Sequence, residues 1–320
     1  MTATEYVQQA IAELDWQREP RGLYEPIGYT LSAGGKRLRP SLAVIASDMF
    51  DGKREEVLPA ALALEVFHNF TLLHDDVMDK ASVRRGRPTV HVRWNENTAI
   101  LSGDQMLIEA YSLLSKVRAD VLPEVLRLFN KMATEICEGQ QYDVDFETRD
   151  DVQIEDYMMM IRLKTSVLLA NALQTGALIA GAGEADQTAL YNYGIETGLA
   201  FQLQDDLLDV YGNPETFGKA TGGDILCAKK TFMLLTAMQS ASDRERNLLS
   251  RLLADKSMDS QEKIAAVTEI YTGLNVRQAC EEEMKKHTDI ALAELDKLSV
   301  SSEKKLILIK LAEKLLARKE

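Results

Sequence analysis

Three aspartates with helical spacing are the residues of this sequence best placed to do chemistry. Asp75, Asp76 and Asp79 stand at positions i, i+1 and i+4 of the segment 73–79. Because positions i and i+4 lie on one face of a helix, Asp75 and Asp79 form a column of two carboxylates with Asp76 beside it. Like charges this close repel each other unless a cation lies between them. An acidic helix end exposed to water is the simpler alternative.

The same spacing recurs far along the chain, at Asp205, Asp206 and Asp209. This second cluster lies inside the apolar stretch 199–210, and two identical clusters among core-like residues are hard to explain as solubilising surface. Oxygen ligands without a nearby set of histidines or cysteines favour Mg²⁺, which binds one or two carboxylates together with substrate phosphates. The pattern therefore predicts two acidic clusters that face each other and hold a diphosphate through bridging Mg²⁺ ions.

Three irregular segments between the expected helices are basic. They are 34–40, 84–88 and 218–224, and the last is followed by Lys229 and Lys230. Glycine lets the backbone approach a ligand closely, and arginine makes bidentate contacts with phosphate oxygens. Each segment precedes or follows an acidic cluster, in a chain whose net charge is −13. This arrangement favours a polyanion bound both by metal ions and by cations directly, over the alternative of solvated surface loops.

Composition limits the class of protein. The chain has 320 residues, of which 46% are hydrophobic, and its net charge of −13 argues against nucleic-acid binding. Cys137, Cys227 and Cys280 lie far apart without metal-ligand spacing, which indicates a reducing compartment. The chain opens without a signal peptide, and no apolar run reaches the roughly 18–20 residues that span a bilayer. We therefore expect a cytoplasmic protein without a membrane span.

The elements that must position these residues are helices. All seven prolines lie at or before Pro214, the window 224–272 has neither glycine nor proline, and alternating β-branched runs are rare. The sequences at 242–245 and 259–262 fit the capping box that starts a helix. With no linker and no change in composition, we expect an all-α protein with one domain over residues 1–320. The expected helices cover residues 4–16, 22–32, 39–50, 57–81, 97–117, 120–146, 151–165, 167–181, 186–211, 229–240, 243–256, 260–272, 276–297 and 302–318.

A diphosphate held by metal ions inside an apolar helical protein suits the ionisation of an allylic diphosphate. Metal ions and basic residues stabilise the leaving diphosphate, and a dry cavity protects the carbocation from water. The chain resembles the trans-isoprenyl diphosphate synthases of isoprenoid biosynthesis, also called polyprenyl synthetases. Segments that match, in the family's order, are Gly-Gly-Lys-Arg-Leu-Arg-Pro at 34–40, Leu-Leu-His-Asp-Asp-Val-Met-Asp at 72–79, Arg-Arg-Gly at 84–86, Lys164 with Thr165, Phe-Gln-Leu-Gln-Asp-Asp-Leu-Leu-Asp at 201–209, and the Gly-Lys…Gly-Gly-Asp stretch at 218–224.

This resemblance implies a single-domain orthogonal helical bundle with the two aspartate motifs facing each other across a central cavity. It implies about three Mg²⁺ ions per active site, which stabilise the charge of the diphosphate. The implied metal ligands are Asp75, Asp79 and Asp205 in main roles and Asp76, Asp206 and Asp209 in support. A homodimer is the assembly expected from the family.

The resemblance also implies the substrates, isopentenyl diphosphate and an allylic diphosphate, which are joined head to tail in the trans configuration. The implied isopentenyl diphosphate ligands are Lys36, Arg39, His68 and Arg85. The implied allylic ligands are Arg84, Lys164, Thr165, Gln202, Lys219 and Lys229, with Lys230 an ambiguous neighbour of Lys229. The Thr165 hydroxyl, the Gln202 amide and the Lys164 carbonyl would stabilise the developing cation. The released diphosphate would take the proton that ends each condensation.

Helical spacing supports two of these assignments separately. His68 lies seven residues before Asp75, so the two share nearly the same helix face, although a core histidine is the alternative. Gln202 lies one turn before Asp205 and Asp206.

The resemblance also implies that bulky residues about one and two turns before the first aspartate motif limit the length of the product. Phe70 and Thr71 stand five and four residues before Asp75, and Phe67 stands eight before it. Phenylalanine followed by threonine resembles synthases that stop at geranylgeranyl diphosphate. A twenty-carbon product is therefore predicted, with the fifteen-carbon farnesyl diphosphate as the second choice. On an ideal helix Phe70 lies about 140° from the face of Asp75 and Asp79, so which aromatic ring forms the pocket floor stays open.

Two other functions fit part of the pattern. A terpene cyclase or squalene-type synthase would share the fold and the metal chemistry, but such enzymes usually lack the motif at 34–40 and replace the second aspartate motif. A non-catalytic partner subunit of an active synthase would commonly have lost aspartate-motif residues, and none is lost here. The sequence therefore favours a catalytic prenyltransferase.

Overall fold

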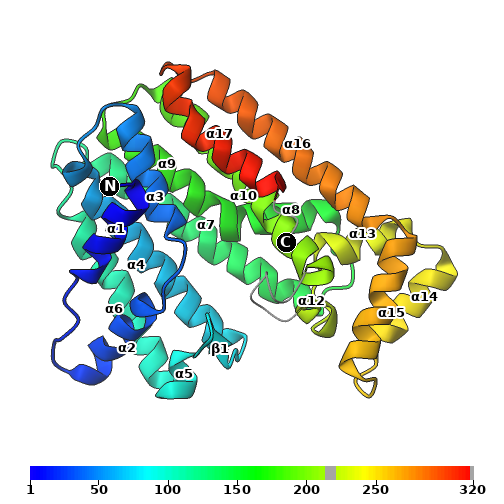
Figure 1. Cartoon of the computed structure of the whole chain (residues 1–320). Coiled ribbons are helices and arrows are strands. Elements are labelled where there is room, and N and C mark those ends of the chain that lie inside the picture. Colours follow the sequence, from blue (N-terminus) through cyan, green and yellow to red (C-terminus); the bar gives the residue numbers. More distant parts are fainter. Residues whose placement is uncertain (213–220, 318–320) are drawn as a thin grey trace. The chain divides into compact units, whose positions relative to one another are not determined.

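The computed structural model describes residues 1–212 and 221–317, with side chains described up to Lys314 (Figure 1). Most of these residues are helical, and the only sheet among them is a two-stranded ribbon, so the predicted all-α class is confirmed. The chain divides into two compact units, Met1–Asn130 with Asn171–Leu190 and Lys131–Ala170 with Tyr191–Glu320. The expectation of one domain over residues 1–320 stays a prediction.

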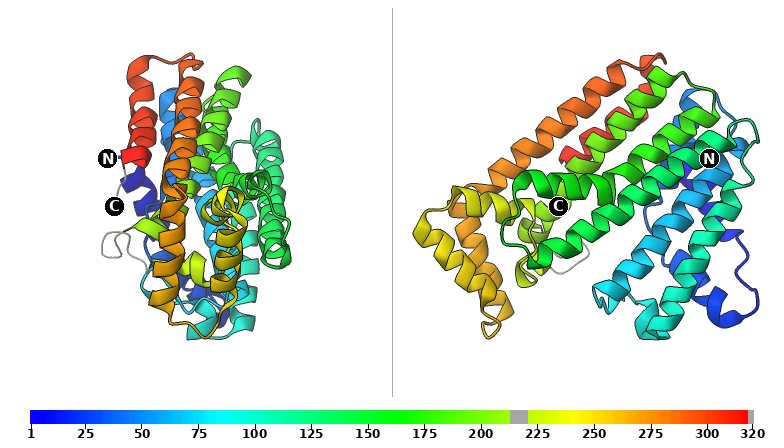
Figure 2. Two further views of the ribbon diagram at one scale, coloured as in Figure 1. Left: turned by 90° about the vertical axis from the view of Figure 1, so that its right-hand side faces the viewer. Right: turned by 180° about the vertical axis from the view of Figure 1, so that it is seen from behind.

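The first unit contains the first aspartate motif, at the end of its long helix α4. This helix packs against α3 and α6, and α6 runs alongside it in the views of Figures 1 and 2. The alanine, valine, leucine and phenylalanine side chains of α4 are mostly buried from Val57 to Leu73. This packing anchors the turn that carries Asp75 and Asp76. The elements of this unit are α1 (Ala3–Ala12), α2 (Arg21–Ser32), α3 (Leu38–Met49), α4 (Arg54–Met78), β1 (Val83–Arg84), β2 (Arg87–Pro88), α5 (Val90–Arg93) and α6 (Glu96–Leu114).

The helix α4 is also long and apolar enough, by length and composition, to cross a membrane. In the structure 61% of its most apolar window is buried inside the protein. Such burial is typical of a core helix, and the neighbouring helices α3 and α6 supply the apolar surroundings.

A short β-ribbon brings the second basic segment next to α4. Strands β1 and β2 are antiparallel, with Arg84 opposite Arg87. The turn between them, Arg85 and Gly86, has positive φ angles of 52° and 73°, as two-residue hairpin turns require. The sequence predicts only an irregular segment here, because two-residue strands are too short to show an alternating pattern.

The second unit contains the second aspartate motif and the C-terminal helices, and α16 and α17 run side by side in it (Figures 1 and 2). Its elements are α8 (Ile154–Ile161), the π-helical turn η1 (Arg162–Ser166), α12 (Gly223–Leu226), α13 (Phe232–Ser240), α14 (Asp243–Ala254), α15 (Ser260–Gly273), α16 (Val276–Asp296) and α17 (Ser302–Ala317). The helices that contribute residues to both units are α7 (Leu122–Thr148), α9 (Val167–Ile179) and α10 (Glu184–Tyr211).

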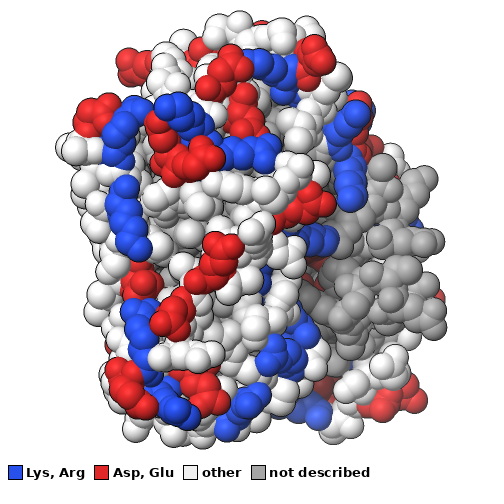
Figure 3. Space-filling view, turned by 60° about the vertical axis from the view of Figure 1, so that its left-hand side comes forward, with Lys and Arg blue, Asp and Glu red and all other residues white. Residues whose placement is uncertain are grey.

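Most predicted helix limits agree with the structure to within three residues. The first helix ends at Ala12, four residues before its predicted end, and the helix predicted over 151–165 is α8 continued by η1. The short helices α5 and α12 were not predicted, because a single turn carries no measurable periodicity. On the face drawn in Figure 3, acidic and basic side chains are interspersed, so this face shows no large region of one sign.

Candidate active site

The first acidic cluster occupies the C-terminal end of α4. Asp75 and Asp76 lie in the last turn, and Asp79 is the C-cap residue, whose N–H donates to the Asp75 carbonyl over 2.8 Å. The C-terminal end of a helix carries the negative end of the helix dipole, so three carboxylates there are unfavourable unless cations compensate them. Arg84 compensates in part, because its Nε lies 2.7 Å from Asp76 Oδ1 and its Nη2 3.8 Å from Asp75 Oδ2. This placement favours a bound cation at the cluster.

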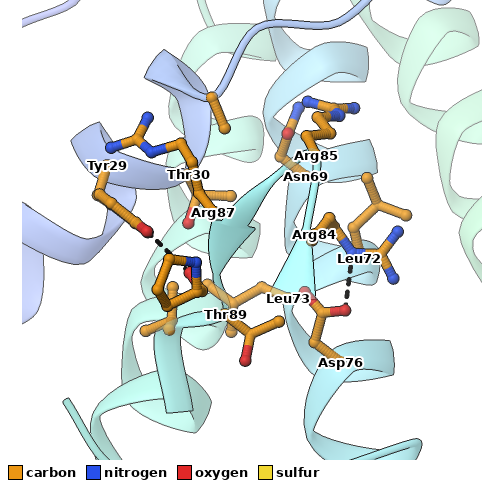
Figure 4. Close-up of a pocket in the computed structure, with 13 residues that line it drawn as sticks. Tyr29, Thr30, Asn69, Leu72, Leu73, Asp76, Arg84, Arg85, Arg87 and Thr89 are labelled. Atoms are coloured by element: carbon orange, nitrogen blue, oxygen red, sulfur yellow. Dashed lines mark hydrogen bonds and ion pairs between the residues drawn. The ribbon is translucent and has the colours of Figure 1, made fainter. Parts of the chain in front are cut away.

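Asp76 is the most buried carboxylate of the first cluster. Its side chain is 8% exposed, and burial raises its pKa although the charge of Arg84 lowers it. The contact between Asp76 and Arg84 joins α4 to strand β1 (Figure 4). Asp76 therefore holds the basic hairpin against the acidic helix end, which agrees with a supporting role.

His68 and Arg39 form a pair on the same unit. Arg39 Nη1 lies 3.1 Å from His68 Nε2, and arginine has no acceptor, so Nε2 must accept and the ring proton lies on Nδ1. Burial, followed by the positive charges of Arg39 and Arg85, holds the pKa of His68 well below its ordinary value. His68 is therefore neutral at pH 7 and orients the Arg39 guanidinium.

A small pocket of about 30 Å³ lies between α2, α4 and the β-ribbon (Figure 4). Its basic lining comes from Arg84, Arg85 and Arg87 of the hairpin, and Asp76 and Asn69 of α4 contribute the acidic and amide groups. The Tyr29 hydroxyl donates to the Pro88 carbonyl over 2.8 Å, which ties α2 to β2. The pocket thus brings together residues of the second basic segment, 84–88, and of the first acidic cluster.

The aromatic rings before the first motif stack along α4. The Phe67 ring is 1% exposed and lies between the rings of Phe70, at 5.5 Å, and Phe129, at 5.1 Å. Phe70 is half-buried and also packs edge-on against the ring of His74 at 4.8 Å. Thr71 donates its hydroxyl to the His68 carbonyl over 2.8 Å. Phe67 is therefore core behind Phe70, and Phe70 keeps an accessible edge.

The second acidic cluster lies in the last two turns of α10, again at a helix C-terminal end. Asp206 is 4% exposed, accepts a hydrogen bond from the Tyr157 hydroxyl and lies 3.2 Å from Gln202 Nε2. Burial, with the nearby negative charge of Asp224, raises the pKa of Asp206 to about 8. Like Asp76 in the first cluster, Asp206 is the buried and hydrogen-bonded carboxylate of its motif.

Asp209 organises the backbone after α10. Its Oδ2 accepts a hydrogen bond from the Asp224 N–H over 3.0 Å, and its carbonyl accepts one from the Gly222 N–H over 2.6 Å. Gly222 has a φ of 84°, a left-handed conformation that favours glycine. Asp209 therefore ties the Gly-Gly-Asp part of the third basic segment to the second motif.

Lys164 and Thr165 lie on the π-helical turn η1, in the same unit as the second motif. Thr165 Oγ1 donates to Gln202 Oε1 over 3.3 Å, and Lys164 Nζ lies 2.6 Å from Asp143 Oδ2. Single π-helical turns inside helices are frequent at functional sites. The structure thus brings Thr165, Gln202 and Asp206 into one hydrogen-bonded chain.

The predicted lysines are placed differently from one another. Lys36 is exposed, Lys229 is half-buried, and Lys219 lies outside the described residues. Lys230 Nζ donates to the Phe146 carbonyl over 3.3 Å, at the C-terminal end of α7. Lys230 thus stabilises a helix end, and the assignment of a phosphate contact to Lys229 stays a prediction.

The carboxylates fit a hard divalent cation that a substrate helps to bind. Among the described residues, no group of three His, Cys, Asp or Glu side chains is arranged to hold a metal ion. Mg²⁺ needs only one or two carboxylates when substrate phosphates complete its shell, so such a group is not required. Each motif offers carboxylate oxygens at the negative end of a helix dipole. That the two motifs face each other across a cavity stays a prediction.

Several residues that shape the site were not predicted. Tyr157 contacts Asp206, Asp143 contacts Lys164, and Glu65 contacts Arg37. Arg37 could have been predicted from the sequence, because it lies inside the motif at 34–40. The others carry no signal in the sequence, because each is one acidic or aromatic residue in an ordinary helix.

Comparison with known proteins agrees with this geometry. The polyprenyl synthetase family model matches residues 20–271. A geranylgeranyl diphosphate synthase of Methanosarcina mazei is 43% identical over 236 residues, 73% of this chain and 73% of its own. A crystal structure of a geranylgeranyl pyrophosphate synthase is 42% identical, covers 100% of both chains and has a TM-score of 0.94. A geranylfarnesyl diphosphate synthase of Natronomonas pharaonis is 38% identical over 82% of this chain and 81% of its own.

The chain belongs to the polyprenyl synthetase family. The resemblance seen in the sequence motifs is therefore confirmed, and the all-helical fold is that of its structural relatives. The roles of single residues are not settled by this membership and are proposals below.

Proposed function

We propose that this chain is a short-chain trans-prenyltransferase, which condenses isopentenyl diphosphate head to tail with allylic diphosphates. The product proposed is the twenty-carbon geranylgeranyl diphosphate. The observation that carries the proposal is the pair of aspartate clusters at helix C-terminal ends, the first joined to a basic hairpin, in a chain of this family. Relatives named geranylgeranyl diphosphate synthase at 43% and 42% identity support the product.

The two clusters would bind Mg²⁺, about three ions per active site. Asp75, Asp79 and Asp205 are the proposed main ligands, and bound Mg²⁺ would supply positive charge against the leaving diphosphate. Asp76, Asp206 and Asp209 hold the surroundings of each cluster, as their contacts with Arg84, Tyr157 and the Asp224 N–H indicate.

The chain's own groups would stabilise the remaining charges. In our proposal the Thr165 hydroxyl, the Gln202 amide oxygen and the Lys164 carbonyl face the developing allylic cation. Arg84, Lys219 and Lys229 would bind the allylic diphosphate. The diphosphate released after ionisation would take the proton that ends each condensation.

Isopentenyl diphosphate would bind to the cations around the loop 34–40. Lys36, Arg39, His68 and Arg85 are the proposed ligands of isopentenyl diphosphate. The 3.1 Å contact of Arg39 with a neutral His68 supports this site, because it orients the guanidinium without adding a further positive charge.

Phe70 is the proposed floor of the product pocket. Phe67 is buried behind Phe70, so a growing chain would meet the accessible edge of Phe70 first. Thr71 precedes the motif by one turn and would line the same wall. A smaller side chain at position 70 would open space toward Phe67 and allow a longer product.

A homodimer is the proposed assembly. Three large apolar side chains share one exposed face of α6, namely Leu101 at 59%, Ile108 at 58% and Tyr111 at 39% exposure. We propose that a second copy covers this face. Light scattering would give the mass of a dimer, and Leu101→Glu with Ile108→Glu should shift it to that of a monomer. A monomeric wild-type chain would contradict the proposal.

The cytoplasmic location stays a prediction.

An assay with purified protein tests the function. Isopentenyl diphosphate and an allylic diphosphate are incubated with the chain, with and without Mg²⁺, and the products are separated by chromatography. A Mg²⁺-dependent twenty-carbon diphosphate is expected. Diphosphate release without isopentenyl diphosphate would favour a cyclase, and no product would favour a non-catalytic partner subunit.

A further inference from the structure

A buried network of charged and polar groups connects the loop 34–40 to the helices around it in the first unit. Arg37 Nη1 lies 2.5 Å from Glu65 Oε1, and its Nη2 donates to the Leu31 carbonyl. Asn69 Nδ2 donates to Glu65 Oε1 over 2.9 Å and to the Glu65 carbonyl over 2.8 Å. Arg37 is 7% exposed, Glu65 3% and Asn69 0%. The network therefore joins the last turn of α2, the loop and the middle of α4.

The backbone of the loop 34–40 has positive φ angles, and one of them falls on a residue type that rarely adopts such an angle. Gly34, Gly35 and Arg37 have φ angles of 79°, 127° and 46°. The two glycines adopt such angles readily, but a left-handed conformation is uncommon for arginine. The two buried contacts of the Arg37 side chain hold this conformation, and Arg37 is the N-cap residue from which α3 starts. The direction of Lys36 and Arg39, on either side of it, follows from the same conformation.

Two other cations depend on the position of the loop and of α4. Arg39 contacts His68, which lies one turn after Glu65 on α4. The Arg85 guanidinium donates to the Gly34 carbonyl and lies against Gly35, where an added Cβ would be 3.0 Å from its Cζ. Arg39 thus contacts α4 three residues after Glu65, and Arg85 contacts the loop that the Arg37–Glu65 pair holds.

Glu65 also balances charge within this cluster. Burial and the positive charge of Arg37 lower the pKa of Arg85, whereas the negative charge of Glu65 raises that pKa. Without a fixed negative charge, the repulsion between neighbouring guanidinium groups would spread them apart. Asn69 carries the network to the pocket of Figure 4, which it lines together with Arg84 and Arg85.

We propose that Arg37 and Glu65 are positioning residues for isopentenyl diphosphate, an inference that depends on the function proposed above. The buried pair holds the loop and the cations around it in place before the substrate binds. Neither residue contacts the substrate. A buried ion pair commonly adds little net stability compared with apolar side chains of similar size, so the effect of this pair on binding can be separated from its effect on folding.

The test is the double variant Arg37→Leu with Glu65→Leu, in the full-length protein. It removes both charges together, so no unpaired charge stays buried. The melting temperature should stay within about 5 °C of the wild type. The KM for isopentenyl diphosphate should rise by about 10-fold to 100-fold, because the loop cations lose their fixed positions. The KM for the allylic substrate and kcat should change by less than about threefold.

A second, more exposed pair of an arginine and a carboxylate in the same unit provides a control. Arg54 Nη2 lies 2.7 Å from Asp48 Oδ2, and the pair joins α3 to the start of α4 away from the loop. Arg54→Leu with Asp48→Leu should leave both KM values unchanged. The single variant Glu65→Gln keeps an oxygen acceptor for Arg37 but removes the charge. It should raise the KM for isopentenyl diphosphate by a smaller factor than the double variant.

Each other outcome overturns the inference in a recognisable way. If the wild type is active and the double variant has an unchanged KM for isopentenyl diphosphate, the pair contributes only to packing. Equal losses for both substrates would indicate general damage to the site. Failure of both the double variant and Glu65→Gln to fold would assign the pair to the fold instead. A wild type without product would contradict the proposed function itself, and this inference with it.

Discussion

Replacing Tyr157 with phenylalanine tests how strongly Asp206 depends on its neighbours. The Tyr157 hydroxyl donates to Asp206 Oδ2, and both side chains are almost fully buried. Phenylalanine keeps the ring in place, so the loss is that of one hydrogen bond. A hydrogen bond to an ionised group contributes about 1.5–3 kcal/mol, and one between neutral groups about 0.5–1.5 kcal/mol. The cost of the substitution therefore depends on whether Asp206 is ionised.

The two protonation states of Asp206 can be reached by changing pH. Its pKa is raised to about 8 by burial, whereas the pKa of Tyr157 is raised well above its ordinary value, so Tyr157 still donates at pH 9. In urea unfolding with EDTA, Tyr157→Phe should lower the free energy of unfolding by about 1 kcal/mol at pH 6 and by about 2 kcal/mol at pH 9. This difference corresponds to a further rise in the pKa of Asp206 of about one unit. Equal losses at the two pH values would refute the reasoning.

The same variant should also change the metal requirement. Groups that orient metal ligands from behind commonly change metal affinity by about 10-fold or more, so Tyr157→Phe should raise the Mg²⁺ concentration for half-maximal turnover by about 10-fold. Tyr193→Phe is the control, because Tyr193 is a buried tyrosine of the same unit whose hydroxyl donates to the Leu308 carbonyl over 2.8 Å. It should show the same loss of stability at both pH values and an unchanged Mg²⁺ requirement.

Three further substitutions test the site. Phe70→Ala should lengthen the main product, because it opens space toward Phe67; an unchanged product spectrum by chromatography would remove Phe70 from the pocket floor. Asp75→Ala should cut turnover by about 100-fold or more through loss of charge stabilisation while the helical circular dichroism stays the same. A rate near that of the wild type would contradict the ligand assignment. His68 has a pKa lowered by burial, so the unfolded state binds more protons and stability falls as the pH drops below about 6.5. Between pH 6.5 and 5.5, the free energy of unfolding measured in urea should fall by about 1 kcal/mol less in His68→Gln than in the wild type. The same pH dependence in both proteins would show that His68 is not held neutral.

Patterns within a single helix were the most predictable features. The spacing of Asp75 and Asp79 indicated a helix, and the helix expected over 57–81 is α4, which ends at Met78. It ends three residues early because Lys80 has a φ of 52°, a left-handed conformation that commonly follows a helix C-terminus. The motifs could also be found from the sequence, because the residues of each are close together along the chain.

Contacts between distant segments could not be predicted from spacing. Tyr157 lies 49 residues before Asp206, and Arg37 lies 28 residues before Glu65. These pairs meet only because separate helices pack together, and one sequence contains no periodic signal that links such positions. The role of Lys230 is a similar case, since only the fold shows that it reaches the Phe146 carbonyl.

The central claim is that both aspartate clusters bind one diphosphate through metal ions. The most direct measurement is a crystal structure with Mn²⁺ in place of Mg²⁺ and an unreactive thio analogue of the allylic diphosphate, in which anomalous scattering locates the metal ions. We predict Mn²⁺ ions bound to Asp75 and to Asp205, with a single diphosphate group between them. Metal ions and diphosphate at one cluster alone, or at neither, would contradict the claim.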